Sequence, residues 1–118
     1  MKIAIPADGK GIDSEVCISF GRTPYFIVAD TESCEFSVID NKAASEQSGA
    51  GVKAAQAVAD SGAGAVVTFH CGKNAADVLK AADIRIYKAV KGTVKDMVQS
   101  YNAGALDELA EINAGYAG

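Results

Sequence analysis

The first part of the chain alternates short apolar stretches with polar turns, a pattern typical of β-strands. Residues 1–7 (MKIAIPA) predict a short buried strand that ends at Pro6. Residues 24–31 and 35–41 are rich in β-branched and aromatic side chains, and they predict two more strands. Only a short polar turn separates these two strands, so we expect them to pair with each other.

The second part of the chain has helical periodicity, interrupted by two further apolar strands. Helices are predicted at about 49–60, 75–82 and 93–101, with a short last helix at 103–112. Their apolar stripes are Val52, Ala55 and Ala59; Ala75, Val78, Leu79 and Ala82; and Val94, Met97, Val98 and Tyr101. Buried strands are predicted at 64–69 and 83–89, a polar loop at 41–51 and a loose tail at 113–118.

Two helix boundaries carry recognisable signals. Thr93 followed by Asp96 resembles a capping box, and Gly62 is a good stop for the first helix. The order of elements is therefore β-β-β-α-β-α-β-α, with the short last helix after it. The later β-α-β units require parallel strands joined by right-handed crossovers. We expect residues 1–118 to form one α/β domain, a mixed sheet with helices on both faces.

Composition excludes several classes of protein. The chain has 118 residues, of which 49% are hydrophobic, so it can build one core. A net charge of −4 makes nucleic acid an unfavourable partner. No apolar run is long enough to span a membrane, and the N-terminus lacks the pattern of a signal peptide, which predicts a cytoplasmic protein. Three cysteines without CxxC spacing predict free thiols in a reducing compartment.

One stretch, VVTFHCGKNA at residues 66–75, combines unusual chemistry with a favourable position. It leads from a buried strand into a helix and contains the single histidine of the chain, His70, beside Cys71. In open α/β sheets, ligands bind beyond the carboxyl ends of the parallel strands. If this strand neighbours the first one, its loop meets the loop of Ala7, Asp8 and Gly9. We expect a functional site where the two loops meet.

The residue types of this stretch suit a soft metal or an anion. A helix N-terminus lowers the pKa of a cysteine, so we expect Cys71 to be partly thiolate. Thiolate and imidazole bind soft metals, Gly72 permits close approach of the backbone, and Lys73 can meet negative charge. The alternative is that Cys71 is core packing and His70 a hydrogen-bonded structural residue. Two adjacent ligands cannot close a four-coordinate site, so any metal is bound openly or within a cofactor that brings ligands of its own.

Other residues are weaker candidates. Cys17 lies in a loop that can fold over the site, whereas Cys34 lies in a β-turn and should be exposed. Arg22 can bind a carboxylate or phosphate, or pair with a local acid. The glycine-rich helix start at Gly49 and Gly51 can cradle an anion, although it lacks the P-loop and dinucleotide motifs.

Four blocks of the sequence resemble one known family. They are SFGRTPYFIVAD, GAGVKAAQAV, HCGKNAADVLKAADIRIYKA and GTVKDMVQSYNAGALDEL. Together they resemble the dinitrogenase iron–molybdenum cofactor biosynthesis family, which includes NifX-like carriers, NafY-type chaperones and the C-terminal domain of NifB. The resemblance covers nearly the whole chain. It implies a ribonuclease-H-like fold with a mixed five-stranded sheet, and binding of an iron–sulfur or iron–molybdenum cluster, or its precursor, without catalysis.

The resemblance also implies a set of binding residues. Ser19, Phe20, Gly21 and Arg22 correspond to the N-terminal signature of the family. The blocks around the two glycine-led helices add Gly49, Gly51, Gly72, Lys73 and Asn74. Ligation of a metal by His70, Cys71 and Cys17 is instead our inference from chemistry. A carrier must release its cluster, so a site of few protein ligands on loops suits it.

Three functions follow from these observations. The first is a cluster carrier whose partners are donor and acceptor proteins, as a monomer or a weak homodimer. The second is an enzyme. A nuclease needs several carboxylates around magnesium, and after Asp8 the first helix offers Lys53 and Gln56 instead; a thiol-dependent enzyme would use Cys71 with His70. The third is a module that binds a small anion or a protein, with Cys71 as packing.

Overall fold

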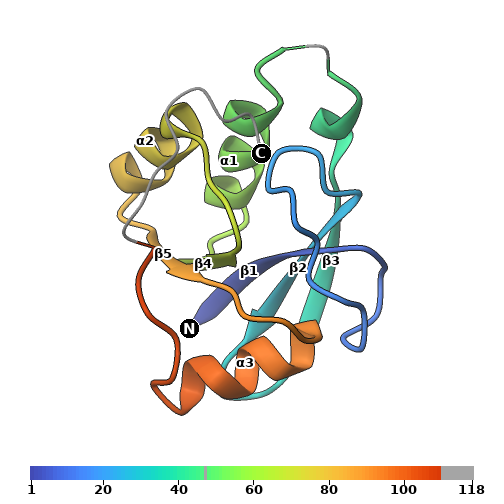
Figure 1. Cartoon of the computed structure of the whole chain (residues 1–118), viewed down its shortest axis with the longest axis vertical. Helices are drawn as coiled ribbons and strands as arrows, with labels where there is room; N and C mark the ends of the chain where they lie inside the picture. Colours follow the sequence, from blue (N-terminus) through green and yellow to red (C-terminus); the bar gives the residue numbers. More distant parts are fainter. Residues whose placement is uncertain (47, 110–118) are drawn as a thin grey trace.

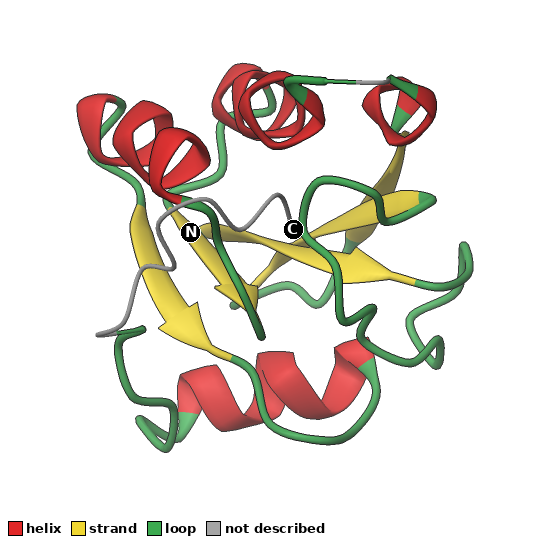
Figure 2. Cartoon of the chain, turned by 45° about the horizontal axis from the view of Figure 1, so that its top comes forward, coloured by secondary structure: helices red, strands yellow, loops and turns green. Residues whose placement is uncertain are grey.

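The computed structural model describes residues 1–46 and 48–109 and consists of three layers (Figures 1 and 2). A five-stranded sheet forms the middle layer, with α1 and α2 on one face and α3 on the other. The strands are β1 (Lys2–Ala7), β2 (Tyr25–Asp30), β3 (Phe36–Asp40), β4 (Ala65–Thr68) and β5 (Arg85–Lys88). The helices are α1 (Ala50–Asp60), α2 (Lys73–Ala81) and α3 (Val94–Asn102), with a 3-10 helix, η1 (Lys42–Ser45), before α1.

The sheet is mixed, and its strand order is β3-β2-β1-β4-β5. β2 runs antiparallel to both β1 and β3, whereas β4 runs parallel to β1 and β5. β1, β3, β4 and β5 therefore all end at the same edge of the sheet. The predicted mixed α/β sheet with helices on both faces is confirmed, and so are the pairing of β2 with β3 and the position of β4 beside β1.

Two apolar clusters bury the two faces of the sheet. On one face, Phe26, Val28 and Val66 of the strands pack against the alanine-rich α1 and against α2. On the other face, Ile5, Ile27 and Val67 pack with residues of α3. The central strands are buried on both faces, which is why β1 and β4 read as continuous apolar runs in the sequence.

Several predicted boundaries need correction. β1 extends one residue beyond Pro6. Proline has no N–H, but this position faces away from β2, so the pairing of β1 with β2 is not interrupted. The predicted loop at 41–51 contains η1. In α1 the buried residues are Ala50, Ala54, Ala55 and Val58, whereas Val52 and Ala59 are only half-buried. In α2 the helix ends at Ala81, so Ala82 lies outside it and is exposed.

The predicted last helix at 103–112 is wrong over the part that the structure describes. α3 ends at Asn102, and Gly104 takes a positive φ of 70°. The chain then runs along β5, where the Lys88 N–H donates to the carbonyl of Asp107 and the Leu109 N–H to that of Ile86. Hydrogen bonds to the sheet thus replace those of a helix. Residues 110–112 and the predicted tail at 113–118 lie outside the described residues.

Candidate functional site

Two helices begin side by side at the edge where the parallel strands end. α1 follows β3 through η1, and α2 follows β4 directly. Because β3 and β4 run in the same direction, both helices start at this edge and pack along one another (Figure 1). The N-terminal N–H groups of a helix lack partners within the helix and carry partial positive charge. The two helix starts therefore place positive ends of two dipoles at one edge.

Neither of these helix starts is capped by its own N-cap side chain. The N-cap residues are Gly49 for α1 and Gly72 for α2, which have no side chain to donate or accept a bond, and neither helix has an acidic residue in its first turn. α3 is the opposite case, since Thr93 and Asp96 form the predicted capping box with bonds of 3.2 and 3.0 Å. Among the described residues, α3 thus starts with a side-chain cap, whereas α1 and α2 start at glycines that leave their first backbone N–H groups without one.

The polar side chains around these helix starts include basic ones. Lys53 of α1 pairs with Glu46 at 2.9 Å, and Lys73 of α2 pairs with Asp77 at 3.2 Å. Both pairs are well exposed, so each contributes little to stability and its lysine can turn to another anion. Asn74, also in the first turn of α2, is exposed. Gly51 in the first turn of α1 is half-buried.

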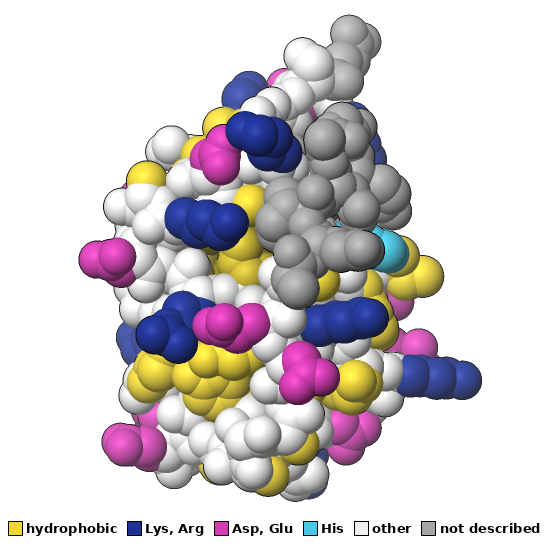
Figure 3. Space-filling view, turned by 60° about the vertical axis from the view of Figure 1, so that its left-hand side comes forward, with side chains coloured by type: hydrophobic (Ala, Val, Ile, Leu, Met, Phe, Trp, Pro, Cys, Tyr) yellow, Lys and Arg dark blue, Asp and Glu magenta, His cyan; other side chains and the backbone are white. Residues whose placement is uncertain are grey.

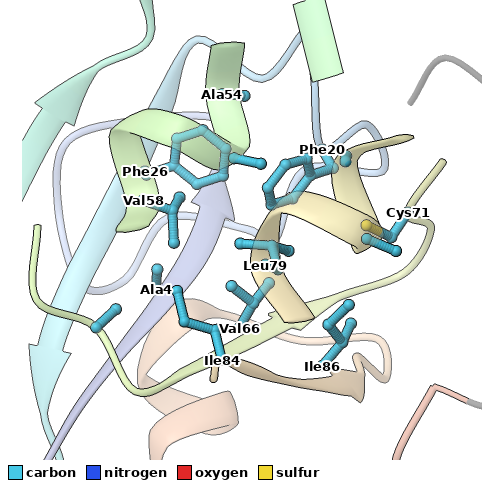
Figure 4. Packing of buried hydrophobic residues seen from close by; sticks show 14 of the residues in the cluster. Ala4, Phe20, Phe26, Ala54, Val58, Val66, Cys71, Leu79, Ile84 and Ile86 are labelled. Carbon is cyan, nitrogen blue, oxygen red and sulfur yellow. The ribbon is translucent and has the colours of Figure 1, made fainter. Parts of the chain in front are cut away.

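Cys71 contributes to the core rather than to the surface of this site. Its side chain is fully buried in the cluster that contains Phe20, Ala75 and Leu79 (Figure 4). Burial raises the pKa of the Cys71 thiol to about 11, with only a small opposing effect of Lys80. The expectation of a partly ionised Cys71 is therefore wrong, because desolvation of the thiolate outweighs the nearby helix N-terminus.

His70, the neighbour of Cys71, is half-buried, and its backbone carbonyl accepts a bond from the Thr68 hydroxyl at 3.1 Å. This bond fixes the turn that links β4 to α2. The two adjacent residues thus differ in exposure: Cys71 lies in the core, whereas His70 is nearer to solvent.

Cys17 lies at the same edge, beyond the end of β4. Its backbone N–H donates to the Pro6 carbonyl at 2.9 Å, and the next residue back, Val16, donates to Gly92 at 3.2 Å. The segment around Cys17 therefore lies between the end of β1 and the loop after β5. Whether this loop also folds over the helix starts stays a prediction.

The Cys17 thiol is half-buried and contacts two polar side chains. Partial burial raises its pKa, and the Asp8 carboxylate adds to the rise, whereas hydrogen bonds from Thr23 and Ser19 oppose it. Cys17 is thus mainly a neutral thiol near pH 7. Cys34 is exposed in the β2–β3 turn with a φ of 65°, as predicted, at the opposite edge of the sheet.

The segment from Ser19 to Arg22 anchors the loop after β1 to the helical layer. Phe20 is fully buried and makes an edge-to-face contact with Phe26, at 5.1 Å between the ring centroids (Figure 4). Arg22 donates to the backbone carbonyls of Ala44 and Glu46 at 3.1 and 2.9 Å. Arg22 therefore binds carbonyls of the segment that leads into α1, rather than the local acid that the sequence suggested.

Sequence reasoning missed two buried polar residues that hold these loops together. The Asn41 side-chain amide donates to the carbonyls of Gly21 and Thr23 at 3.0 and 2.8 Å. The Thr23 hydroxyl, fully buried, lies 3.0 Å from the Ala7 carbonyl oxygen. Both are ordinary polar residues at strand ends, and no local pattern in the sequence marks their role.

The predicted site residues come from separate segments of the chain. Ser19 to Arg22, Gly49 with Gly51, and His70 to Asn74 all follow strands that end at the same edge of the sheet. Within the ranges 1–46 and 48–109, no three His, Cys, Asp or Glu side chains are grouped so that they could hold a metal ion. None of the helices in these ranges is long and apolar enough to cross a membrane.

Comparisons with known proteins give a family match and several similar proteins. The family model described as dinitrogenase iron–molybdenum cofactor matches residues 1–104. The apo form of the orange protein from Desulfovibrio gigas is 35% identical, with a TM-score of 0.90 and 95% of each chain covered. A putative NifB protein from Thermotoga is 33% identical, with a TM-score of 0.83 and 98% of each chain covered. An uncharacterised protein from Methanocaldococcus jannaschii is 28% identical, covering 92% of this chain and 91% of that protein.

Proposed function

Because the chain belongs to the dinitrogenase iron–molybdenum cofactor family, we propose that it is a non-catalytic carrier of an anionic iron–sulfur or iron–molybdenum cluster, or of its precursor. It takes this cargo from a donor protein and passes it to an acceptor protein during cofactor assembly. We place the protein in the cytoplasm, where its three free cysteines stay reduced.

One observation carries this proposal: the bare starts of α1 and α2 lie side by side, with no acidic residue in either first turn. Each helix start offers backbone donors and about half a positive charge to an anion. Lys53 and Lys73 lie in exposed ion pairs with Glu46 and Asp77, and each lysine can turn from its carboxylate to an anion bound near the helix starts. A negatively charged cluster that brings its own sulfides needs this kind of environment more than it needs many protein ligands.

The ligands that we propose for the metal are His70 and Cys17. His70 lies on the loop between β4 and α2, and Cys17 is a partly exposed thiol on the loop after β1. Cys17 is protonated near neutral pH, so metal must displace its proton. Few ligands on loops favour reversible binding, as a carrier requires. In this proposal Cys71 does not bind the metal, and its role is to pack in the core next to the start of α2.

The test is uptake of iron and sulfide by the whole chain. Protein is incubated anaerobically with ferrous iron and sulfide, then desalted, and iron and acid-labile sulfide per chain are measured with the visible spectrum. We expect uptake by the wild type and by Cys71→Ala, and reduced uptake by Cys17→Ser and His70→Ala. Cys34→Ala controls for adsorption at an exposed thiol and should keep full uptake.

A charge substitution separates loss of binding from loss of folding. Asn74→Asp places a carboxylate in the first turn of α2, which stabilises the helix start but repels an anion. We expect it to lower cluster uptake without lowering the unfolding midpoint. Gln99→Glu makes the same charge change on an exposed position of α3 and should leave uptake unchanged. Equal uptake by both variants would contradict the role of the helix starts.

A second candidate function is a module that binds a small anion without metal. The same bare helix starts favour it. It predicts that inorganic phosphate shifts the amide resonances at the starts of α1 and α2, while iron and sulfide are not retained. A thiol-dependent enzyme is less well supported, because the Cys71 thiol is fully buried and its pKa is raised to about 11.

A further inference from the structure

The two outermost strands of the sheet, β5 and β3, differ in how their outer sides are protected. At the β5 edge, residues 107–109 run along the strand and pair with it through hydrogen bonds at Lys88 and Ile86. Figure 3 views this side, where basic and acidic side chains are interspersed with hydrophobic ones. At the β3 edge, no other strand among residues 1–46 and 48–109 pairs with β3 on its outer side.

The hydrogen bonds of β3 define which backbone groups point outward. The Asp30 N–H donates to the Glu35 carbonyl at 2.8 Å, and the Asn41 N–H donates to the Pro24 carbonyl at 3.0 Å. Bonding alternates along an antiparallel pair, so every second residue from Glu35 to Asn41 faces β2. The residues between them, Phe36, Val38 and Asp40, direct their N–H and C=O groups away from the sheet.

The side chains at this edge are apolar and exposed. Phe36 and Val38 are 43% and 37% exposed, although their partners in the register, Ala29 and Ile27, are fully buried. Phe36 and Val38 lie on the same face of the sheet as the apolar residues that α3 covers, and they continue that face onto β3. Natural sheets usually protect such an edge with lysine, proline or a bulge, and residues 36–40 (FSVID) contain no lysine or proline.

We propose that β3 pairs with β3 of a second copy of this chain, antiparallel and about a two-fold axis at Val38. This register places Val38 opposite Val38 of the other copy, and Phe36 opposite Asp40, so all three outward-facing residues find hydrogen-bonding partners. Phe36 then lies diagonal to the Val38 of the other copy, on the same face of a sheet that continues through both molecules. The two Phe36 and two Val38 side chains form one apolar cluster.

The charges of the strand also fit a second copy in this register. The two Asp40 residues are four positions apart along the paired strands, about 14 Å, so their repulsion is largely screened at physiological salt. Glu35 lies opposite Asn41 of the other copy, next to its Lys42. Each acidic residue thus avoids a directly opposite acid, and one of them gains a nearby base.

The predicted association is weak and lies away from the His70 part of the cluster site. A strand of five residues provides less contact than a standard stable interface, so we expect a reversible dimer that forms as concentration rises. β3 lies at the opposite end of the strand order from β4 and β5, so the pairing leaves the His70 loop accessible. Dimerisation and cluster uptake can therefore fail separately.

Sedimentation velocity at rising protein concentration tests this proposal. We expect the wild type to shift from 12.1 kDa towards twice that mass. Val38→Lys places two like charges opposite each other at the axis and should weaken the dimer about tenfold or more. Ile18→Lys is the matched control, since Ile18 is 65% exposed but lies on the loop after β1. A wild type that stays monomeric, or a Val38→Lys dimer as strong as the wild type, would overturn the proposal.

Disulfide trapping tests the register itself. In a Cys34→Ser background, Val38→Cys places two cysteines opposite each other at the axis, at about the 5.5 Å between Cα atoms that a disulfide accepts. Mild oxidation should then give a covalent dimer. Phe36→Cys is equally close to the edge, but its symmetry mate is four residues away, so it should remain monomeric on a non-reducing gel. Efficient cross-linking of Phe36→Cys would reject this register.

Discussion

Replacing Cys71 with alanine should make the chain less sensitive to alkaline pH. Burial raises the pKa of the Cys71 thiol from its ordinary 9.0 to about 11. Below pH 9 the thiol is neutral in the folded and unfolded states, so it adds no pH dependence. Between pH 9 and pH 11 only the unfolded chain loses the proton, so the free energy of unfolding falls as pH rises.

The size of this effect follows from the two pKa values. A difference of about two pH units, at about 1.4 kcal/mol each, corresponds to about 2.7 kcal/mol once both states are ionised. By pH 11 about 2 kcal/mol of this is already lost. At pH 8, Cys71→Ala should be about 1 kcal/mol less stable than the wild type, because it leaves a small gap in the core. By pH 11 the order should reverse, and the variant should be the more stable protein.

Urea denaturation at intervals from pH 8 to pH 11, in the presence of a reductant, measures both proteins. The tyrosines and lysines of the chain also titrate in this range, but they are the same in both proteins and cancel in the difference. Cys34→Ala removes an exposed thiol instead and should follow the wild type at every pH. A difference between wild type and Cys71→Ala that stays constant with pH would refute a buried, neutral thiol.

Three further substitutions test local structure at the start of α1, in the loops joined by Asn41 and at the cap of α3. Gly49→Ala forces a side chain into a left-handed conformation with φ of 73° and should lower the free energy of unfolding by about 1–2 kcal/mol, measured in urea. Asn41→Ala leaves the carbonyls of Gly21 and Thr23 without the amide donor of this side chain, so the free energy of unfolding, measured in urea, should fall by about 1–3 kcal/mol; a near-neutral result would mean that water replaces the amide. Thr93→Ala removes the cap of α3 and should cost about 1 kcal/mol, with faster amide exchange in the first turn of α3, whereas Thr93→Ser should retain most of the protection.

Local pattern in the sequence was sufficient for most of the fold. The apolar runs of β1 and β4, the β-branched residues of β2 and the helical spacing in α2 and α3 each occur within one segment, so they could be predicted without knowing the neighbours. The capping box at Thr93 and the stop at Gly62 are also local. The order of elements then limited the topology to a mixed sheet, because parallel strands need crossovers.

Prediction failed where a distant part of the chain changed the local preference. Residues 103–109 have a helix-like composition, but the helix stops at Asn102 and the backbone of residues 107–109 pairs with β5 instead. Arg22 has the chemistry of an anion ligand, but it donates to carbonyls more than twenty residues away in sequence. The role of Asn41 was not visible either, because the carbonyls that it bridges come from another loop.

The sequence by itself indicated the family and the order of the five strands and the three main helices, because periodicity and turn signals act over a few residues. It also predicted the edge of the sheet where a site should lie. Only the tertiary structure decided what Cys71 does. The sequence placed it at a helix start, where a thiolate would be favoured, but packing against Phe20 and Leu79 removes it from water. Desolvation depends on residues brought from other segments, and it outweighs the local field of the helix.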